Sequence, residues 1–202
     1  MTSTSRATAD GSLPRSVPPH VELLIAFTNS EDHELDTDDL TTRPQLTQWL
    51  FDHGLLERRV AATDGDLALA RQLRAGLRDA LVANHDGSLD YSALDTAAAQ
   101  LPLRLSGSLI GAQEGQLGLQ PGLRPVQDGI RGALARVLIA VNSAVADDTW
   151  RRLKICSADD CLWAFYDTTK NRSRAWCEWG CGNKAKTRNY RARKKAADGD
   201  VR

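Results

Sequence analysis

The N-terminal part of the chain alternates between apolar segments with helical spacing and short polar breaks. Val21 to Phe27 is a compact apolar run that fits either a first helix or a short strand. Leu46 and Trp49 fall on one face of a helix that begins near Thr42. A longer helix follows Asp64, which we expect to cap it, with its arginines directed away from the apolar face. That face comprises Leu67, Ala70, Leu73, Leu77 and Leu81.

In the middle of the chain the spacing of apolar residues changes from helical to strand-like and back to helical. Residues 89–101 predict an alanine-rich third helix. Leu103-Arg104-Leu105 and Leu117-Gly118-Leu119 then alternate like strands and predict a hairpin, and Pro121 to Pro125 is typical of a turn. Residues 126–145 carry the longest apolar helical pattern, which predicts the central core helix.

The segment Glu31 to Asp39 shows neither the helical nor the strand-like spacing of apolar residues, and it is rich in acidic residues and threonine. It departs from a calcium-binding loop because Thr41 stands at the place of the turn glycine and Thr47 at that of the bidentate glutamate. We therefore expect a solvated loop.

The last fifty residues combine an aromatic strand-like segment, Leu162 to Tyr166, with polar surroundings. Asp167 to Ser173 predicts a turn, and Arg174 to Trp176 can return as a second strand. From about Gly182 the chain is compatible with a helix. The pattern as a whole predicts a mainly α (α+β) protein, with a helical N-terminal domain, a small β-hairpin and a small C-terminal module.

Composition is that of an ordinary soluble protein, with 202 residues of which 42% are hydrophobic and 26% charged. No apolar run approaches the ~18 residues of a membrane span, and the first residues lack the apolar core of a signal peptide, so we expect a cytoplasmic protein without membrane association. The expected organisation is a disordered tail over 1–19, a helical domain over 20–149, a basic module over 150–197 and a tail over 198–202.

Charge changes this picture because the formal net charge of zero hides a division. Residues 151–195 hold 13 Lys and Arg against four acids, a net charge of +9, whereas residues 1–150 hold 12 Arg against 20 acids, a net charge of −8. Every lysine lies at or beyond Lys154. Such asymmetry indicates a basic module directed at a polyanion and carried by an acidic body.

All four cysteines of the chain lie in this basic module, with the spacing C-x4-C-x15-C-x3-C. They are Cys156, Cys161, Cys177 and Cys181. Four thiolates suit one structural Zn²⁺ in a closed tetrahedral site, which holds structure and does no chemistry itself. We therefore predict one structural zinc.

Other uses of the cysteines and histidines are weaker. Two disulfides would need an oxidising compartment, neither cysteine pair has the two intervening residues of a thioredoxin-like redox site, and an iron–sulfur cluster or free thiols remain further alternatives. The sequence holds no constellation of nucleophile, base and open metal site, so we expect no enzyme activity. The histidines, which stand singly without ligand spacing, are His20, His33, His53 and His85.

The C-terminal module resembles the CGNR zinc finger over Arg152 to Lys195. The resemblance rests on the paired cysteines, the aromatic segment Trp163 to Asp167, the stretch Arg174 to Cys177, and Cys181-Gly182-Asn183-Lys184. The fourth signature residue is Lys184 where the family has Arg, which keeps the charge but loses planar bidentate bonding. The resemblance implies a small treble-clef-like zinc finger with four cysteine ligands.

The preceding part resembles the ABATE domain from about Val21 to Val145. The resemblance rests on Phe27-Thr28-Asn29, on the segment Leu46 to Leu56, on the arginine and leucine rhythm from Arg71 to Leu81, and on the hairpin followed by a long helix. It implies a mainly helical domain with a small sheet in a stress-induced transcription regulator.

The expected binding surface is the basic C-terminal helix, since a zinc-anchored basic helix commonly contacts DNA. The expected nucleic-acid contacts are Lys184, Lys186, Arg188, Arg191, Arg193 and Lys195 for charge, and Asn183, Asn189 or Arg172 for bases. A solvated basic tail and a module that docks an acidic protein surface are the alternatives. A small-molecule effector in the helical domain is conceivable, although the sequence names no residue for it and leaves the oligomeric state open.

Overall fold

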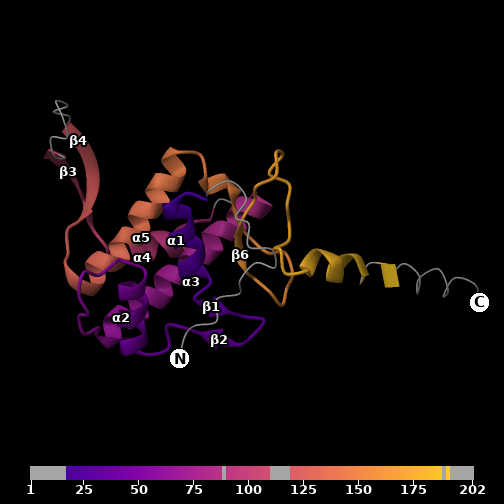
Figure 1. Cartoon of the computed structure of the whole chain (residues 1–202), viewed down its shortest axis with the longest axis horizontal. Helices are drawn as coiled ribbons and strands as arrows, with labels where there is room; N and C mark the ends of the chain where they lie inside the picture. Colours follow the sequence, from indigo (N-terminus) through magenta and orange to yellow (C-terminus); the bar gives the residue numbers. More distant parts are fainter. Residues whose placement is uncertain (1–16, 88–89, 110–118, 188–189, 192–202) are drawn as a thin grey trace, which may run out of the picture.

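The structure is a computed structural model that describes residues 17–87, 90–109, 119–187 and 190–191. The body of the described chain is a bundle of helices with a hairpin at one end and the cysteine-bearing module at the other (Figure 1). Its helices are α1 (Pro19–Thr28), α2 (Arg43–Asp52), α3 (Asp64–Asp86), α4 (Ser92–Ala98) and α5 (Gly129–Ala146). The expected mainly α architecture is confirmed, and the segment that begins at Val21 is a helix.

Side-chain caps fix where α2 and α3 begin. The Thr42 hydroxyl accepts a hydrogen bond from the backbone N–H of Gln45, as the predicted start near Thr42 requires. At α3 the capping residue is Thr63, whose hydroxyl accepts from the N–H of Asp66 while the Asp66 carboxylate accepts from the N–H of Thr63. Asp64, predicted to be the cap, instead lies in the first turn, because only Thr63 is paired with an acid three residues later.

A single aliphatic core lies where α1, α3 and α5 pack together. Leu24, Leu73, Leu77 and Leu134 have no exposed surface. α5 reaches the length of a membrane span, with a mean hydropathy of 1.3 over 18 residues, and 44% of that window is buried inside the body. Its apolar character is therefore that of a core helix, as the sequence predicts.

The hairpin is present, with β3 (Leu103–Leu109) antiparallel to β4 (Leu119–Pro125) and Leu103 opposite Pro125. Leu117 and Gly118 lie outside the described residues. Pro121 to Pro125 belongs to the second strand, so the predicted turn there is wrong. Prolines are tolerated because each strand of a two-stranded ribbon has an open edge.

The boundaries of the two helices that flank the hairpin also differ from prediction. α5 begins only at Gly129, since β4 extends to Pro125 and Asp128 takes the N-cap position. α4 spans Ser92–Ala98, with Ala99 as its C-cap, and is therefore shorter than the predicted range 89–101.

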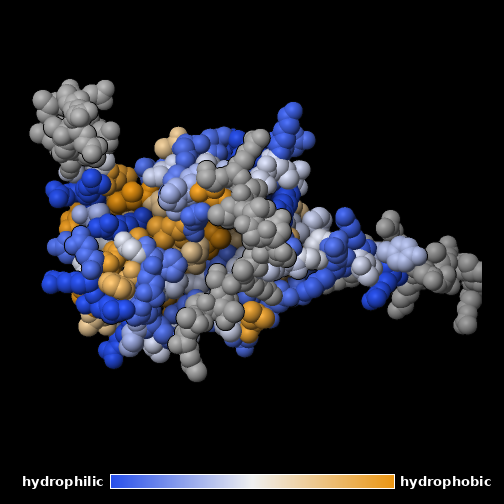
Figure 2. All heavy atoms as spheres, in the orientation of Figure 1, coloured by the Kyte–Doolittle hydropathy of each residue, from blue (hydrophilic) through white to orange (hydrophobic). Residues whose placement is uncertain are grey.

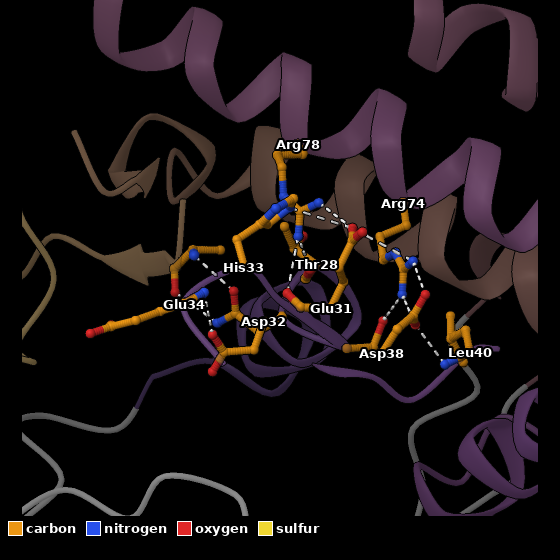
Figure 3. A network of polar contacts seen from close by, with 12 residues as sticks. Thr28, Glu31, Asp32, His33, Glu34, Asp38, Leu40, Arg74 and Arg78 are labelled. Atoms are coloured by element: carbon orange, nitrogen blue, oxygen red, sulfur yellow. Dashed lines mark hydrogen bonds and ion pairs between the residues drawn. The ribbon is translucent and has the colours of Figure 1, made fainter. Parts of the chain in front are cut away.

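The acidic segment is an anchored loop rather than a solvated one, and Figure 3 shows why. It forms two short paired strands, β1 (Glu31–Asp32) and β2 (Thr37–Asp38), under α3. Arg74 of α3, whose side chain is 4% exposed, contacts both oxygens of Asp38 at 2.7 and 2.9 Å. Arg78 contacts Glu31 at 2.5 Å. Burial alone would raise the pKa of Asp38, but hydrogen bonds from Arg74 outweigh it and hold that pKa below its ordinary value.

The cysteine-bearing module begins with a short 3-10 turn, η1 (Trp150–Arg152), followed by β5 (Leu153–Ile155) and β6 (Ala164–Tyr166). β5 pairs with β6, so the predicted return strand at Arg174 to Trp176 is wrong. The aromatic segment finds its partner upstream of the first cysteine, in a stretch whose apolar residues also belong to the main core.

Candidate metal centre

Different local structures bring the four cysteines together. Cys156 follows β5 directly, and Cys161 closes a tight loop in which its N–H donates to the Ala158 carbonyl at 3.0 Å. Cys177 lies in an irregular segment, and Cys181 is the first residue of a helix over 181–187. Gly180, with a φ of 87°, makes the turn that directs the chain into this helix.

The four sulfurs form one buried cluster in which all lie within 4.8 Å of one another. The Sγ of Cys177 is 3.7 Å from that of Cys161 and 3.6 Å from that of Cys181. Tetrahedral zinc with Zn–S bonds of about 2.3 Å places its sulfurs about 3.8 Å apart. All four cysteines are free thiols, so the cluster is no pair of disulfides. Its geometry fits one zinc ion in a closed site, as expected from the spacing.

Hydrogen bonds among the sulfurs, together with burial, shift the pKa of three of the cysteines. A hydrogen bond with Cys177 lowers the pKa of Cys156 to about 5 and raises that of Cys177, while burial raises the pKa of Cys161 to about 12. These shifts favour the thiolate form of Cys156 and the thiol form of Cys161 and Cys177. A divalent cation would let the others ionise, since thiolates are the form that binds zinc.

Aromatic side chains surround the sulfurs and shield them from water. Phe165 is buried with the four cysteines, and Trp163, Trp176 and Trp179 pack partly buried against them. Such a shell makes the site closed to substrate, which fits a structural role for the metal.

A buried ion pair supports the loop between the two cysteine pairs. Lys154 Nζ lies 2.8 Å from Asp167 Oδ2, and the two side chains are 6% and 0% exposed. The same Nζ donates to the carbonyls of Arg172 and Arg174, and the Asp167 carboxylate accepts from Thr169 and from the Arg174 N–H. Sequence reasoning missed this pair, whose available signal was a lysine amid apolar residues of a strand.

Two asparagines of the helical body hold the module in place. Asn29, at the end of α1, donates to the Ala164 carbonyl at 2.9 Å and accepts from the Ala164 N–H at 2.8 Å. Asn84 of α3 donates to the carbonyls of Trp150 and Leu153. Leu153, which is fully buried, belongs to the main core together with Ala164. The first half of the module is therefore fixed to the body.

The expected nucleic-acid residues lie partly at the described end of the chain. Asn183, Lys184, Lys186 and Arg191 are exposed on and just beyond the helix that starts at Cys181. That end projects from the body and is predominantly hydrophilic (Figures 1 and 2). The expected contacts that lie outside the described residues are Arg188, Asn189, Arg193 and Lys195.

Two of the expected nucleic-acid contacts that the structure describes form ion pairs with acids of the body. Arg172 lies 2.5 Å from Asp148, and Lys184 Nζ lies 2.8 Å from Glu34 in the acidic loop. The hydrogen bond that Lys184 donates to the Glu34 carboxylate raises the pKa of Lys184. Both pairs are partly exposed, so their contribution to stability is small.

Fold and cluster together define the class of the chain as a helical domain that carries a four-cysteine zinc finger. Residues 22–153 match the ABATE family model, described as "Putative stress-induced transcription regulator", and residues 152–194 match that of the CGNR zinc finger. The chain belongs to the ABATE family. A search of curated proteins finds no match. The family, the fold class and the single zinc site expected from the sequence are thus confirmed.

Proposed function

We propose that the protein is a cytoplasmic transcription regulator that binds DNA through its zinc finger and has no catalytic activity of its own. In this proposal the helical domain spans 20–149 and the finger spans 150–197. Cys156, Cys161, Cys177 and Cys181 bind one structural zinc. The family description and the zinc cluster support the general class, and the charge distribution supports DNA as the partner.

The observation that carries the proposal is the separation of charge between body and finger. Residues 151–195 have a net charge of +9 and residues 1–150 one of −8. A phosphate backbone attracts the positive charge that is concentrated in the finger, whereas it repels the acidic body. DNA would therefore meet the finger first.

Each basic residue has an assigned role in this proposal. Lysines and arginines from Lys184 to Lys195 neutralise phosphates, and Asn183, Asn189 or Arg172 reaches base edges. Lys184, which stands where the signature has arginine, offers a single point charge to a phosphate rather than a planar pair of donors.

The salt dependence of binding tests the electrostatic mechanism. Zinc-loaded full-length protein is titrated against labelled duplex DNA by fluorescence anisotropy at several salt concentrations. Neutralising about five phosphates predicts that log affinity falls with log salt at a slope of about −4 to −5. A flat response, or no binding at low salt, would refute DNA binding by this surface.

Charge-removing variants then locate the contact. Lys186→Gln with Arg191→Gln removes two exposed charges from the projecting end and should reduce the slope by about 2 units. Arg43→Gln, which removes an exposed arginine from the body, is the matched control and should leave the slope unchanged. Equal effects of the two changes would place the contact elsewhere.

A second candidate is a finger that docks an acidic protein surface, and the contact between Lys184 and Glu34 favours it. If this contact competes with DNA, Glu34→Gln should raise DNA affinity about two- to fivefold, since it frees a cation and removes an anion. If the finger instead serves to hold acidic surfaces, Glu34→Gln changes nothing in DNA binding, and the salt slope above is absent.

A further inference from the structure

An open cavity lies where the hairpin meets the helical body. Figure 1 shows the hairpin at the opposite end of the body from the projecting finger helix. Its volume is about 840 Å³. The segment after α2, the inner ends of β3 and β4, and the first two turns of α5 form its walls. This size falls within the ~300–1,000 Å³ of small-molecule sites.

Four arginines line this cavity, and within the described chain none of them bonds to an acid or to another segment. Arg58, Arg104 and Arg136 make no hydrogen bond or ion pair there, and Arg124 bonds only to the carbonyl of its own neighbour, Leu123. The other described arginines of the body each bond to a carboxylate, an amide or a carbonyl. These are Arg43, Arg59, Arg71, Arg74, Arg78 and Arg131.

The charged residues that line the cavity are net positive, whereas the body around it is net negative. Glu57 and Asp128 also line it, so four positive side chains stand against two negative ones. Residues 1–150 as a whole carry a net charge of −8. The four arginines come from the segment after α2, from both strands of the hairpin and from α5, and guanidinium groups bind carboxylates and phosphates through paired hydrogen bonds.

Further features of the wall suit an organic anion rather than a bare ion. Gly129 and Gly132 place the first turn of α5, with its positive partial charge, at the cavity. Gln127 lines it too, and its Oε1 is buried without a hydrogen-bond partner in the described structure. An amide can turn to offer oxygen or nitrogen, so it can bond to a hydroxyl or a carboxylate. Leu55 and Val60 supply an apolar wall.

We propose that this cavity is an effector site for a small organic anion that carries carboxylate or phosphate groups. The inference goes beyond DNA binding and does not depend on it. Nucleic acid is disfavoured as the occupant because the site is concave, is set in an acidic body, and lies at the opposite end from the basic finger (Figure 1).

The test uses zinc-loaded full-length protein with citrate, pyrophosphate and a short DNA duplex as separate probes at constant ionic strength. Binding is measured by calorimetry and by the melting temperature. Citrate or pyrophosphate at about ten times its Kd should raise the melting temperature by about 3 to 6 °C, because only the folded protein has the site. The probe with the larger effect identifies carboxylate or phosphate as the natural group.

A variant pair makes the result specific to the cavity. Arg104→Gln with Arg136→Gln should weaken anion binding at least about tenfold and abolish the melting shift, whereas Arg43→Gln, an exposed arginine outside the cavity, should do neither. The two substituted residues, Arg104 and Arg136, are both exposed, so the variant should fold normally.

Three outcomes would overturn the proposal. The first is the absence of any shift with either anion, and the second is an equal shift in the cavity variant and the control. The third is a loss of duplex binding in the cavity variant while small anions have no effect, which would reassign these arginines to nucleic acid. The finger variants described above distinguish this result from a failure of the DNA proposal itself.

Discussion

The helical body and the zinc finger have interiors of different chemistry. The body buries leucines, alanines and a few aromatic residues from every helix in one continuous core. The finger's own cluster contains Phe165 and four cysteines as its buried members. Fully burying one leucine stabilises by about 1.5–3 kcal/mol, whereas a structural zinc contributes about 10–16 kcal/mol of apparent folding free energy. The body therefore depends on apolar burial and the finger on its metal.

Zinc removal is the largest expected perturbation and the sharpest test of this difference. A strong chelator should unfold the chain beyond Asp167, exposing Trp176 and Trp179, while α1 to α5 keep their structure. Tryptophan fluorescence, far-UV circular dichroism and metal analysis would follow the change, with one zinc expected per chain before treatment. A chain that unfolds completely, or one that does not respond, would contradict the contrast between the two regions.

The next largest effect is expected from the buried pair Lys154 and Asp167. Lys154→Met should cost about 3–5 kcal/mol because it leaves a buried carboxylate unpaired. Arg151→Gln, which removes an exposed pair with Asp148, is the control and should cost less than about 1 kcal/mol. Denaturant unfolding of the zinc-loaded protein measures the loss of unfolding free energy in both variants. Equal losses would show that the buried ion pair does not stabilise the finger.

The same pair predicts sensitivity to acid. Burial alone would raise the pKa of Asp167, but hydrogen bonds from Lys154 and Thr169 outweigh it and lower that pKa from 3.8 to about 2. A depressed pKa contributes stability that is complete above pH ~4 and is lost as the pH falls toward ~2, with a total of roughly 2 kcal/mol. Asp167→Asn should remove this component, and an unchanged acid profile in that variant would refute it.

A similar test in the body concerns Arg74, which is as deeply buried as Lys154. Arg74→Met should cost about 3 kcal/mol, because the Asp38 carboxylate loses both of its guanidinium bonds. Arg43→Met, at an exposed pair with Asp64, should cost under about 1 kcal/mol. If Arg74→Met proves neutral, the acidic loop is held by something other than this pair.

The smallest expected effect lies at the contact between the two regions. Asn29→Ala removes both hydrogen bonds to the Ala164 backbone and should cost about 1–2 kcal/mol. Faster hydrogen exchange at the Ala164 amide would show that the finger has loosened from α1. Asn171→Ala, in an exposed turn, is the control and should leave this exchange rate unchanged.

Local patterns predicted the features that depend on neighbouring residues. The spacing of the cysteines predicted the zinc cluster, and Thr42 predicted the start of α2. Pairings between distant segments were not predictable in this way. The strand partner of Ala164 to Tyr166 comes from upstream of Cys156, and Arg74 is buried because Asp38 lies opposite it across the fold. A helical pattern alone assigns an arginine to solvent, since it carries no information on distant acids.

The hydrogen bonds of Asn29 and Asn84 also bear on how the ion enters and leaves. Since Cys156 continues directly from a strand anchored in the body, a protein stripped of its metal should retain that thiol close to its final position. Cys161 would stay near it, while Cys177 and Cys181 swing away with the basic helix. When zinc rebinds, Cys177 and Cys181 should return to a pair of cysteines that has stayed in place. Rebinding should therefore need no refolding of the helical body.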